Sequence, residues 1–335
     1  MESRIIVDRG YMAGNPPILG INGTSTEQRL VGGDLNIFYV NAAHALANDG
    51  NDGLDPQFPL ATIQELVDRS TGASVYRPAV QDYETIYVQS AVTESVLTGT
   101  NTQMPSYVSL IGVGPGGFNP GWTSDGAALP CLTLNCEGWR VSGFDFHPPA
   151  TAAGILLNEI PASDFVSYKT TIQNCTFDGL WSGLYGIQFV GSPHRVAILN
   201  NWFVEINNGA DTAFCIYVTD SSNANPYQCS IIGNRFSDSD NYIGNLNSDR
   251  GFNVSLFMDN IFETGVLLTP TIYLDLRGGS RGDNIVTRNV FCGIYSVAGG
   301  YAAHAVNPGM WVGNFAQDVA SPQVADNGLT IAPPV

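Results

Sequence analysis

Four carboxylates in the middle of the chain are the residues best suited to catalysis. They are Asp178, Glu205, Asp238 and Glu263. Each follows a phenylalanine by one or two positions, so a repeating fold would place them in a column along one edge. Neighbouring carboxylates whose pKa values are driven apart can act as acid and base in polysaccharide cleavage. The alternative, which we favour, is a solvated acidic edge that keeps sheets from aggregating.

A second cluster of oxygen-bearing residues occurs in the stretch NDGNDGLD, residues 48–55. It offers a weak candidate site for a cation, formed by Asp49, Asn51, Asp52 and Asp55. The spacing does not fit an EF-hand loop, which needs Gly at position 6 and Glu at position 12. Clusters of Asn, Asp and Gly more commonly form turns. The following Thr62-Ile63-Gln64-Glu65 fits a capping box and predicts a short amphipathic helix over residues 62–68.

Two glycine motifs resemble functional signatures but lack the structural context that those signatures need. Residues 112–117 match G-x-G-x-x-G, yet the sequence FNPGWTSDG that follows cannot form the helix that presents amides to a phosphate. Residues 278–282 match G-x-S-x-G, but a nucleophile elbow also needs a helix after the serine. The four histidines lack zinc-ligand spacing; they are His44, His147, His194 and His304. We therefore predict no cofactor, and no metal beyond the weak cation candidate.

Composition narrows the classes of partner. The chain has 335 residues, 44% of them hydrophobic and 13% charged, with a net charge of −17; an ordinary protein has about 25% charged residues. Strong negative charge argues against nucleic acid and anionic membranes as partners. No apolar run reaches the ~18 residues of a membrane span, which predicts no membrane insertion. The six cysteines contain no C-x-x-C pair and are expected to be buried, reduced thiols.

An internal repeat organises most of the chain. It is marked by seven phenylalanines, five residues before each of which stands an apolar residue. Four copies also carry Asn two residues before the phenylalanine. The phenylalanines are Phe146, Phe177, Phe203, Phe236, Phe262, Phe291 and Phe315, and the asparagines are Asn201, Asn234, Asn260 and Asn289.

Short strands at a fixed interval, without helices between them, are typical of a β-solenoid. Like residues of successive coils then stack, Phe on Phe inside the coil. A ladder of Asn at the bend can hydrogen-bond from coil to coil and satisfy polar groups that are buried there. The sequence therefore predicts an all-β, single-stranded solenoid with parallel strands.

The repeat resembles the right-handed parallel β-helix of the pectate-lyase-like superfamily. Residues 37–68, with Tyr-Val, an Asn/Asp-Asp-Gly turn and Thr-Ile-Gln in that order, resemble the start of many such proteins. The resemblance implies right-handedness and a helix at 62–68 that caps the first coil. We expect an extended anchoring arm over 1–36, the β-helix over 37–315 and a tail over 316–335.

The same resemblance suggests where the protein acts. Polygalacturonase motifs of this fold, N-T-D, D-D and G-H-G, are missing, and no signal peptide is evident. We expect a non-enzymatic bacteriophage virion protein, a capsid decoration (cement) or head-fibre protein, assembled as a homotrimer and released by host lysis. Residues 1–36 would bind other virion proteins such as the major capsid protein.

The alternative function is a tailspike or a free polysaccharide-degrading enzyme, a lyase or a glycoside hydrolase, that acts on host-surface polysaccharide. It would use the four carboxylates above. Exposed aromatic residues would stack on sugars, and the candidates for that role are Trp181, Trp202, Tyr185 and Tyr217.

Overall fold

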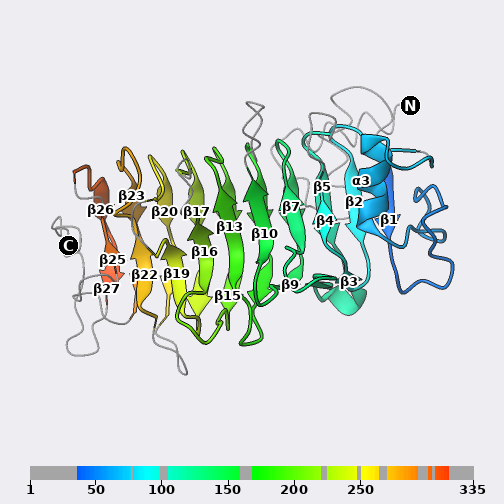
Figure 1. The fold of residues 1–335 in the computed structure, drawn as a ribbon. Coiled ribbons are helices and arrows are strands. Elements are labelled where there is room, and N and C mark those ends of the chain that lie inside the picture. Colours follow the sequence, from blue (N-terminus) through cyan, green and yellow to red (C-terminus); the bar gives the residue numbers. More distant parts are fainter. Residues whose placement is uncertain are drawn as a thin grey trace.

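The chain winds into a solenoid in which three short strands recur in every coil (Figure 1). The computed structural model describes residues 36–76, 78–98, 105–158, 168–219, 225–246, 250–263, 270–292, 301–303 and 306–316. The predicted arm and tail lie outside these residues, apart from their innermost positions, 36 and 316. No helix in the described part is long and apolar enough to cross a membrane.

All strand pairs are parallel and form three sheets, here called A, B and C. Sheet A has ten strands: β1 (Ile37–Val40), β2 (Thr85–Val88), β5 (Ser109–Gly112), β8 (Arg140–Ser142), β11 (Thr171–Gln173), β14 (Ala197–Leu199), β17 (Ser230–Ile232), β20 (Leu256–Met258), β23 (Ile285–Thr287) and β26 (Met310–Val312). Sheet B has nine: β3 (Val92–Thr93), β6 (Gly121–Thr123), β9 (Asp145–His147), β12 (Thr176–Asp178), β15 (Trp202–Val204), β18 (Arg235–Ser237), β21 (Ile261–Phe262), β24 (Val290–Phe291) and β27 (Phe315–Ala316). Sheet C has eight: β4 (Val96–Leu97), β7 (Leu132–Leu134), β10 (Ala153–Asn158), β13 (Tyr185–Val190), β16 (Phe214–Val218), β19 (Asn241–Gly244), β22 (Ile272–Asp275) and β25 (Tyr301–Ala302).

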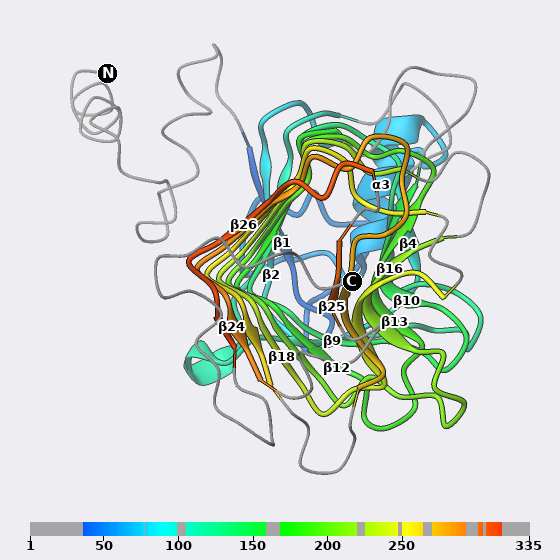
Figure 2. The same ribbon diagram turned by 90° about the vertical axis from the view of Figure 1, so that its left-hand side faces the viewer.

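The solenoid is right-handed. Seen from its C-terminal end (Figure 2), the chain passes from sheet A through sheet B to sheet C counter-clockwise while it advances toward the viewer. The same hand is preferred by parallel strands joined by crossovers in general. The predicted right-handed, parallel β-helix is therefore confirmed.

Sheets A and B meet at a sharp bend that is held by an asparagine ladder. Along it, Asn201, Asn234, Asn260, Asn289 and Asn314 are linked by Nδ2–H···Oδ1 bonds of 3.0 Å. From Asn234 onward, each Oδ1 also accepts the backbone N–H of the ladder asparagine in the preceding coil. Each Nδ2 also donates to a backbone carbonyl of the preceding coil. The residue before each Asn has positive φ. A two-residue bend therefore buries five amides and satisfies all of them.

Inside the bend, aromatic rings of successive coils stack on one another. Phe177 lies 5.2 Å from Phe146 and 4.8 Å from Phe203 between ring centroids, and the rings of both pairs are nearly parallel. The stack continues through Phe236 and Phe262, each step measuring 5.0 Å. It then reaches Phe291 at 5.5 Å and begins at Trp122, which lies 5.2 Å from Phe146. This column forms much of the apolar core.

The prediction that Phe315 ends this stack is wrong. Asn314 occupies the next rung of the ladder, so the position two residues later, Ala316, pairs with Phe291. Phe315 is shifted to the outer face of sheet B, where 49% of it is exposed. The same one-residue shift puts Trp311, not Met310, in register with the inward-facing Val286.

A helix covers the N-terminal edge of sheet C. Helix α3 (Ile63–Thr71) begins after the N-cap Thr62 and ends at Gly72, which has φ of 79°; it runs three residues further than the sequence predicts. It continues the row of sheet C beyond the edge strand β4 (Figure 1). There Gln64 Oε1 accepts the backbone N–H of Leu97 in β4 at 2.9 Å. The helix thus satisfies part of an edge that would otherwise be open to pairing.

A 3₁₀ turn, η1 (Pro115–Gly117), occupies the G-x-G-x-x-G stretch. No α-helix follows it: the next element in chain order is strand β6. The motif therefore forms a turn between coils.

The ladder predicts that one internal asparagine has a large effect on stability. In Asn234→Ala, the backbone N–H of Asn201 and the carbonyl of Ile198 lose their buried partner. Because each unsatisfied buried group costs about 1–3 kcal/mol, we expect a loss of roughly 3 kcal/mol in the free energy of unfolding. Urea unfolding followed by circular dichroism measures it. The exposed Asn119→Ala is the matched control and should change stability by less than about 0.5 kcal/mol; equal effects would contradict the ladder.

Candidate functional site

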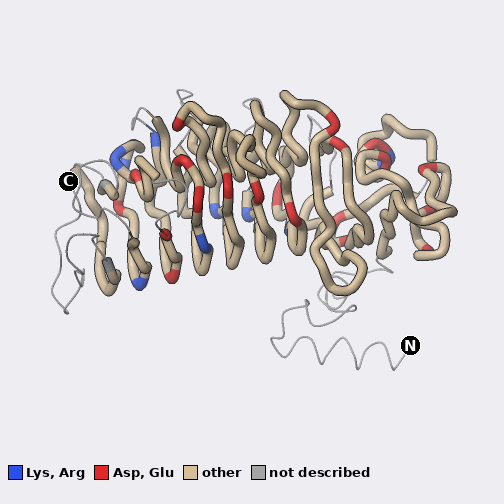
Figure 3. Tube along the Cα trace, turned by 90° about the horizontal axis from the view of Figure 1, so that it is seen from below, with Lys and Arg blue, Asp and Glu red and all other residues tan. Residues whose placement is uncertain are grey.

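The four candidate carboxylates lie at the ends of strands of sheet B: Asp178 is the last residue of β12, and the other three each directly follow a strand. Acidic residues recur in successive coils of the solenoid (Figure 3). They do not form a single column. Asp178 is in register with Val204 and Ser237, so Glu205 and Asp238 each lie one residue further along the chain. Those two residues have φ of 56° and 43° and belong to the turn toward sheet C. Glu263 directly follows Phe262, at the same offset as Asp178.

Three of these carboxylates nevertheless influence one another. Partial burial raises the pKa of Glu205, and the negative charges of Asp178 and Asp238 raise it further. Asp145 lies on β9, the strand that precedes that of Asp178 in sheet B, and burial raises its pKa. The nearby His147 lowers this pKa, whereas the charge of Asp178 raises it further. The His147 ring nitrogen Nδ1 lies 3.3 Å from the backbone carbonyl of Asp178. A carboxyl whose pKa is raised by a neighbouring carboxylate is the arrangement from which acid–base chemistry can start.

Glu263 is separated from this group by an ion pair. Its Oε1 lies 2.9 Å from the Arg235 guanidinium, which also stands 5.6 Å above the Trp202 ring. The Trp202 indole N–H donates to Ser237 at 3.1 Å. The arginine occupies the carboxylate of Glu263, so this residue is poorly placed to act on a substrate.

The four candidate aromatic residues are spread over different faces. Trp202 is on sheet B and is 44% exposed, while Trp181 lies in the turn between sheets B and C. Tyr185 and Tyr217 stack on each other at 4.4 Å on sheet C and belong to a small separate apolar cluster. They do not line one sugar-binding surface with the carboxylates.

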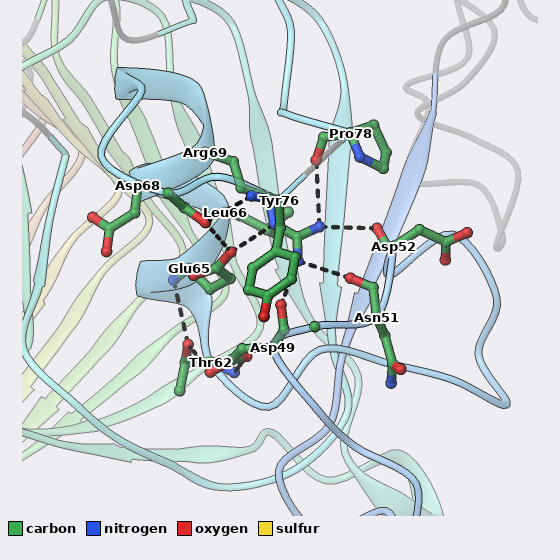
Figure 4. A network of polar contacts seen from close by, with 12 residues as sticks. Asp49, Asn51, Asp52, Thr62, Glu65, Leu66, Asp68, Arg69, Tyr76 and Pro78 are labelled. Carbon is green, nitrogen blue, oxygen red and sulfur yellow. Dashed lines mark hydrogen bonds and ion pairs between the residues drawn. The ribbon is translucent and has the colours of Figure 1, made fainter.

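The weak cation candidate at residues 48–55 is a turn folded around an arginine (Figure 4). The Arg69 guanidinium, fully buried, donates to the carbonyls of Asp49, Asn51 and Asp52 and pairs with Glu65 at 2.8 Å. A guanidinium thus takes the carbonyl oxygens that a metal ion would use.

The four side chains of that candidate are also committed elsewhere. Asp49 accepts the backbone N–H groups of residues 61 and 62, and the carboxylates of Asp52 and Asp55 each accept an N–H two residues on. Asn51 donates to two backbone carbonyls. Within the described ranges, no three or more His, Cys, Asp or Glu gather as a metal site. The cation interpretation is therefore replaced by a structural one.

The six cysteines are free thiols, five of them buried and Cys292 partly buried. Burial raises the pKa of Cys131, Cys136, Cys175 and Cys229 to about 12, which keeps these thiols protonated and unreactive. The prediction that the cysteines are buried is confirmed for five of the six.

A pocket that the sequence did not predict lies at the edge where coils pass from sheet C to sheet A. Its lining includes His194, Tyr227, Ser280 and Arg281. The one available signal was the G-x-S-x-G match at residues 278–282, which contributes Ser280 and Arg281. His304, the one histidine that follows this motif in the sequence, lies outside the described residues.

Comparisons with known proteins give a distant likeness. No protein-family model matches the chain, and no curated protein is significantly similar. A search of solved structures matches the A-module of the mannuronan C-5 epimerase AlgE4 from Azotobacter vinelandii. The match has 12% sequence identity, covers 84% of this chain and 96% of that chain, and has a TM-score of 0.30. A TM-score this low supports no conclusion about activity. The fold assignment, a right-handed parallel β-helix, rests on the strand order and handedness seen directly in the chain.

Proposed function

We propose that this chain is a non-enzymatic structural protein of a bacteriophage particle, a capsid decoration or head-fibre protein that works as a homotrimer. Contact with the major capsid protein through residues 1–36 is part of the same proposal. The observation that carries it is the outer face of sheet A, which has the character of a protein–protein interface.

The C-terminal half of that face carries no charge. Five strands, β14, β17, β20, β23 and β26, each bury their central residue and turn the two flanking residues outward. We call the ten outward residues the apolar face: Ala197, Leu199, Ser230, Ile232, Leu256, Met258, Ile285, Thr287, Met310 and Val312. Eight of the ten are apolar, and two are hydroxyl residues.

Such a face is unusual on a protein with a net charge of −17. Contiguous exposed apolar surface on a soluble protein marks an interaction site. Solvent-facing strands normally alternate apolar-in with polar-out, whereas here eight of the ten outward positions are apolar. Strands about 4.8 Å apart make this five-strand face roughly 20 Å long, so identical subunits aligned along a common axis would share one continuous contact.

The bacteriophage setting is supported by the resemblance drawn from the sequence, since β-helix subunits of this kind occur in virion fibres and decoration proteins. The virion role can be tested by measuring which proteins the particles contain. In purified particles from the source of this chain, quantitative mass spectrometry against the major capsid protein should find tens to hundreds of copies. Absence of the chain from the particles would exclude the virion role.

Assembly through the apolar face predicts different effects for two matched isoleucines. Ile285, on sheet A, and Ile261, on sheet B, are both 40% exposed at the first position of a strand. Ile285→Glu should convert the trimer to monomer, because three like charges would be desolvated in the contact. Ile261→Glu should leave the trimer intact. Light scattering coupled to size-exclusion chromatography measures the mass, and circular dichroism checks that both variants fold. A monomeric wild-type protein would contradict the proposal.

The alternative, a polysaccharide-cleaving enzyme, is favoured by one observation: the raised pKa of Glu205 beside Asp178 on sheet B. That pair could divide into general acid and base. Our proposal predicts no turnover of neutral or acidic polysaccharides, measured by new reducing ends and by the ultraviolet absorbance of lyase products. An activity that falls about 100-fold or more in Glu205→Gln, but not in Glu263→Gln, would establish the enzyme instead.

A further inference from the structure

An open pocket of about 470 Å³ lies on the edge between sheets C and A. Four successive coils contribute to it, through the segments that join β13 to β14, β16 to β17, β19 to β20 and β22 to β23. His194 is bridged to Tyr227, and Tyr227 to Asn253, as neighbouring rungs of a parallel ladder. The wall is therefore built on regular coil-to-coil pairing.

Arg281 is fixed at the rim of this pocket. Its backbone N–H and that of Gly282 both donate to Asn253 Oδ1, at 2.8 and 3.0 Å. Gly279, just before, has φ of 101°, and a Cβ there would come within 2.8 Å of the same oxygen. The guanidinium stands 5.8 Å above the Tyr227 ring and reaches its hydroxyl at 3.5 Å. The loop thus holds a cation over the pocket.

This cation is not neutralised by a carboxylate. Among the described residues, the ion pairs join five other basic side chains to acids: Arg69, Lys169, Arg235, Arg277 and Arg288. Arg281 makes none of them, and neither does Arg195, which follows His194 on the same edge and contacts Gln228 and Tyr168. In so acidic a protein, an arginine such as Arg281, which lines an open pocket and has no acidic partner among the described residues, is available to an anion.

Another residue of the pocket lining, Asn225, has an unused acceptor. Asn225 Oδ1 is buried and has no hydrogen-bond partner, although the Asn225 backbone N–H is bonded to Ser192 Oγ. A buried polar atom without a partner is costly, and a ligand that donates a hydrogen bond removes that cost. The pocket therefore combines donors for an oxyanion, from Arg281, Ser280 and Tyr227, with an acceptor for a hydroxyl group.

We propose that this pocket binds a small hydroxylated oxyanion, that is, a carboxylate or phosphate group with a neighbouring hydroxyl. Arg281 forms charge-assisted bonds to the oxyanion, and planar guanidinium groups suit both carboxylate and phosphate. Asn225 accepts the hydroxyl, which discriminates against acids that lack one. This binding site is independent of the proposed assembly face on sheet A.

Isothermal titration with four simple probes tests the site on the full-length protein. Glycerate and glycerol 1-phosphate carry both groups, acetate lacks the hydroxyl, and glycerol lacks the charge. We expect glycerate or glycerol 1-phosphate to bind with a Kd of about 1 mM and the other two to bind at least ~10-fold more weakly. The stronger of the first two identifies the oxyanion as carboxylate or phosphate.

Paired variants assign the binding to the pocket. Arg281→Gln should weaken binding at least ~10-fold, whereas Arg288→Gln, which removes the same charge at the bend between sheets A and B, should not. Tyr227→Phe, a smaller change, provides a second test should Arg281→Gln fail to fold. Asn225→Ala should abolish the preference for glycerate over acetate. The proposal is overturned if the wild-type protein binds none of the probes, if glycerol binds as well as the acids, or if Arg281→Gln and Arg288→Gln have equal effects.

Discussion

The bend between sheets A and B imposes the constraint on which the rest of the solenoid depends. A two-residue turn at that point buries an amide side chain in every coil of the ladder, from Asn201 to Asn314. Buried amides are tolerated only when they are hydrogen-bonded, and here the partner of each is the same residue of the next coil. Coils therefore cannot slip relative to one another without leaving several polar groups unsatisfied at once.

This fixed register decides what the neighbouring positions do. The residue two places after each ladder Asn points inward and stacks, which produces the phenylalanine column. In the last coil, hydrogen bonding in the ladder and burial of the phenylalanine require different registers. Asn314 keeps its place in the ladder, which moves Phe315 outward and puts Ala316 in register with Phe291. The hydrogen-bonding requirement thus prevails over burial of one aromatic ring, whose transfer from water is worth only about 2 kcal/mol.

The repeat could be found in the sequence because the ladder and the stack restrict the same positions in every coil. Alignment on phenylalanine, however, gave the last coil the wrong register, since Asn314 was the better marker. The acidic column was predicted from similar spacing, but a shift of one residue separates Glu205 from the offset of Asp178. The segments that form the pocket at Arg281 are not all of the same length. Their residues therefore do not recur at a fixed sequence interval, and no repeat pointed to the pocket. The role of Arg69 in the 48–55 turn likewise gave no signal, because its partners in that turn are backbone carbonyls.

The solenoid carries surfaces of different chemical character on different sides. Sheet A is apolar over its C-terminal half, the outer side of sheet B carries the interacting carboxylates, and the edge between sheets C and A carries arginines without acidic partners. Each side repeats along the axis because the register is constant from coil to coil. If subunits associate through the apolar face, the outer side of sheet B and the Arg281 pocket, which belong to other parts of the coil, stay accessible. Assembly and ligand binding are then compatible in one protein, and substitution of either surface should remove one without the other.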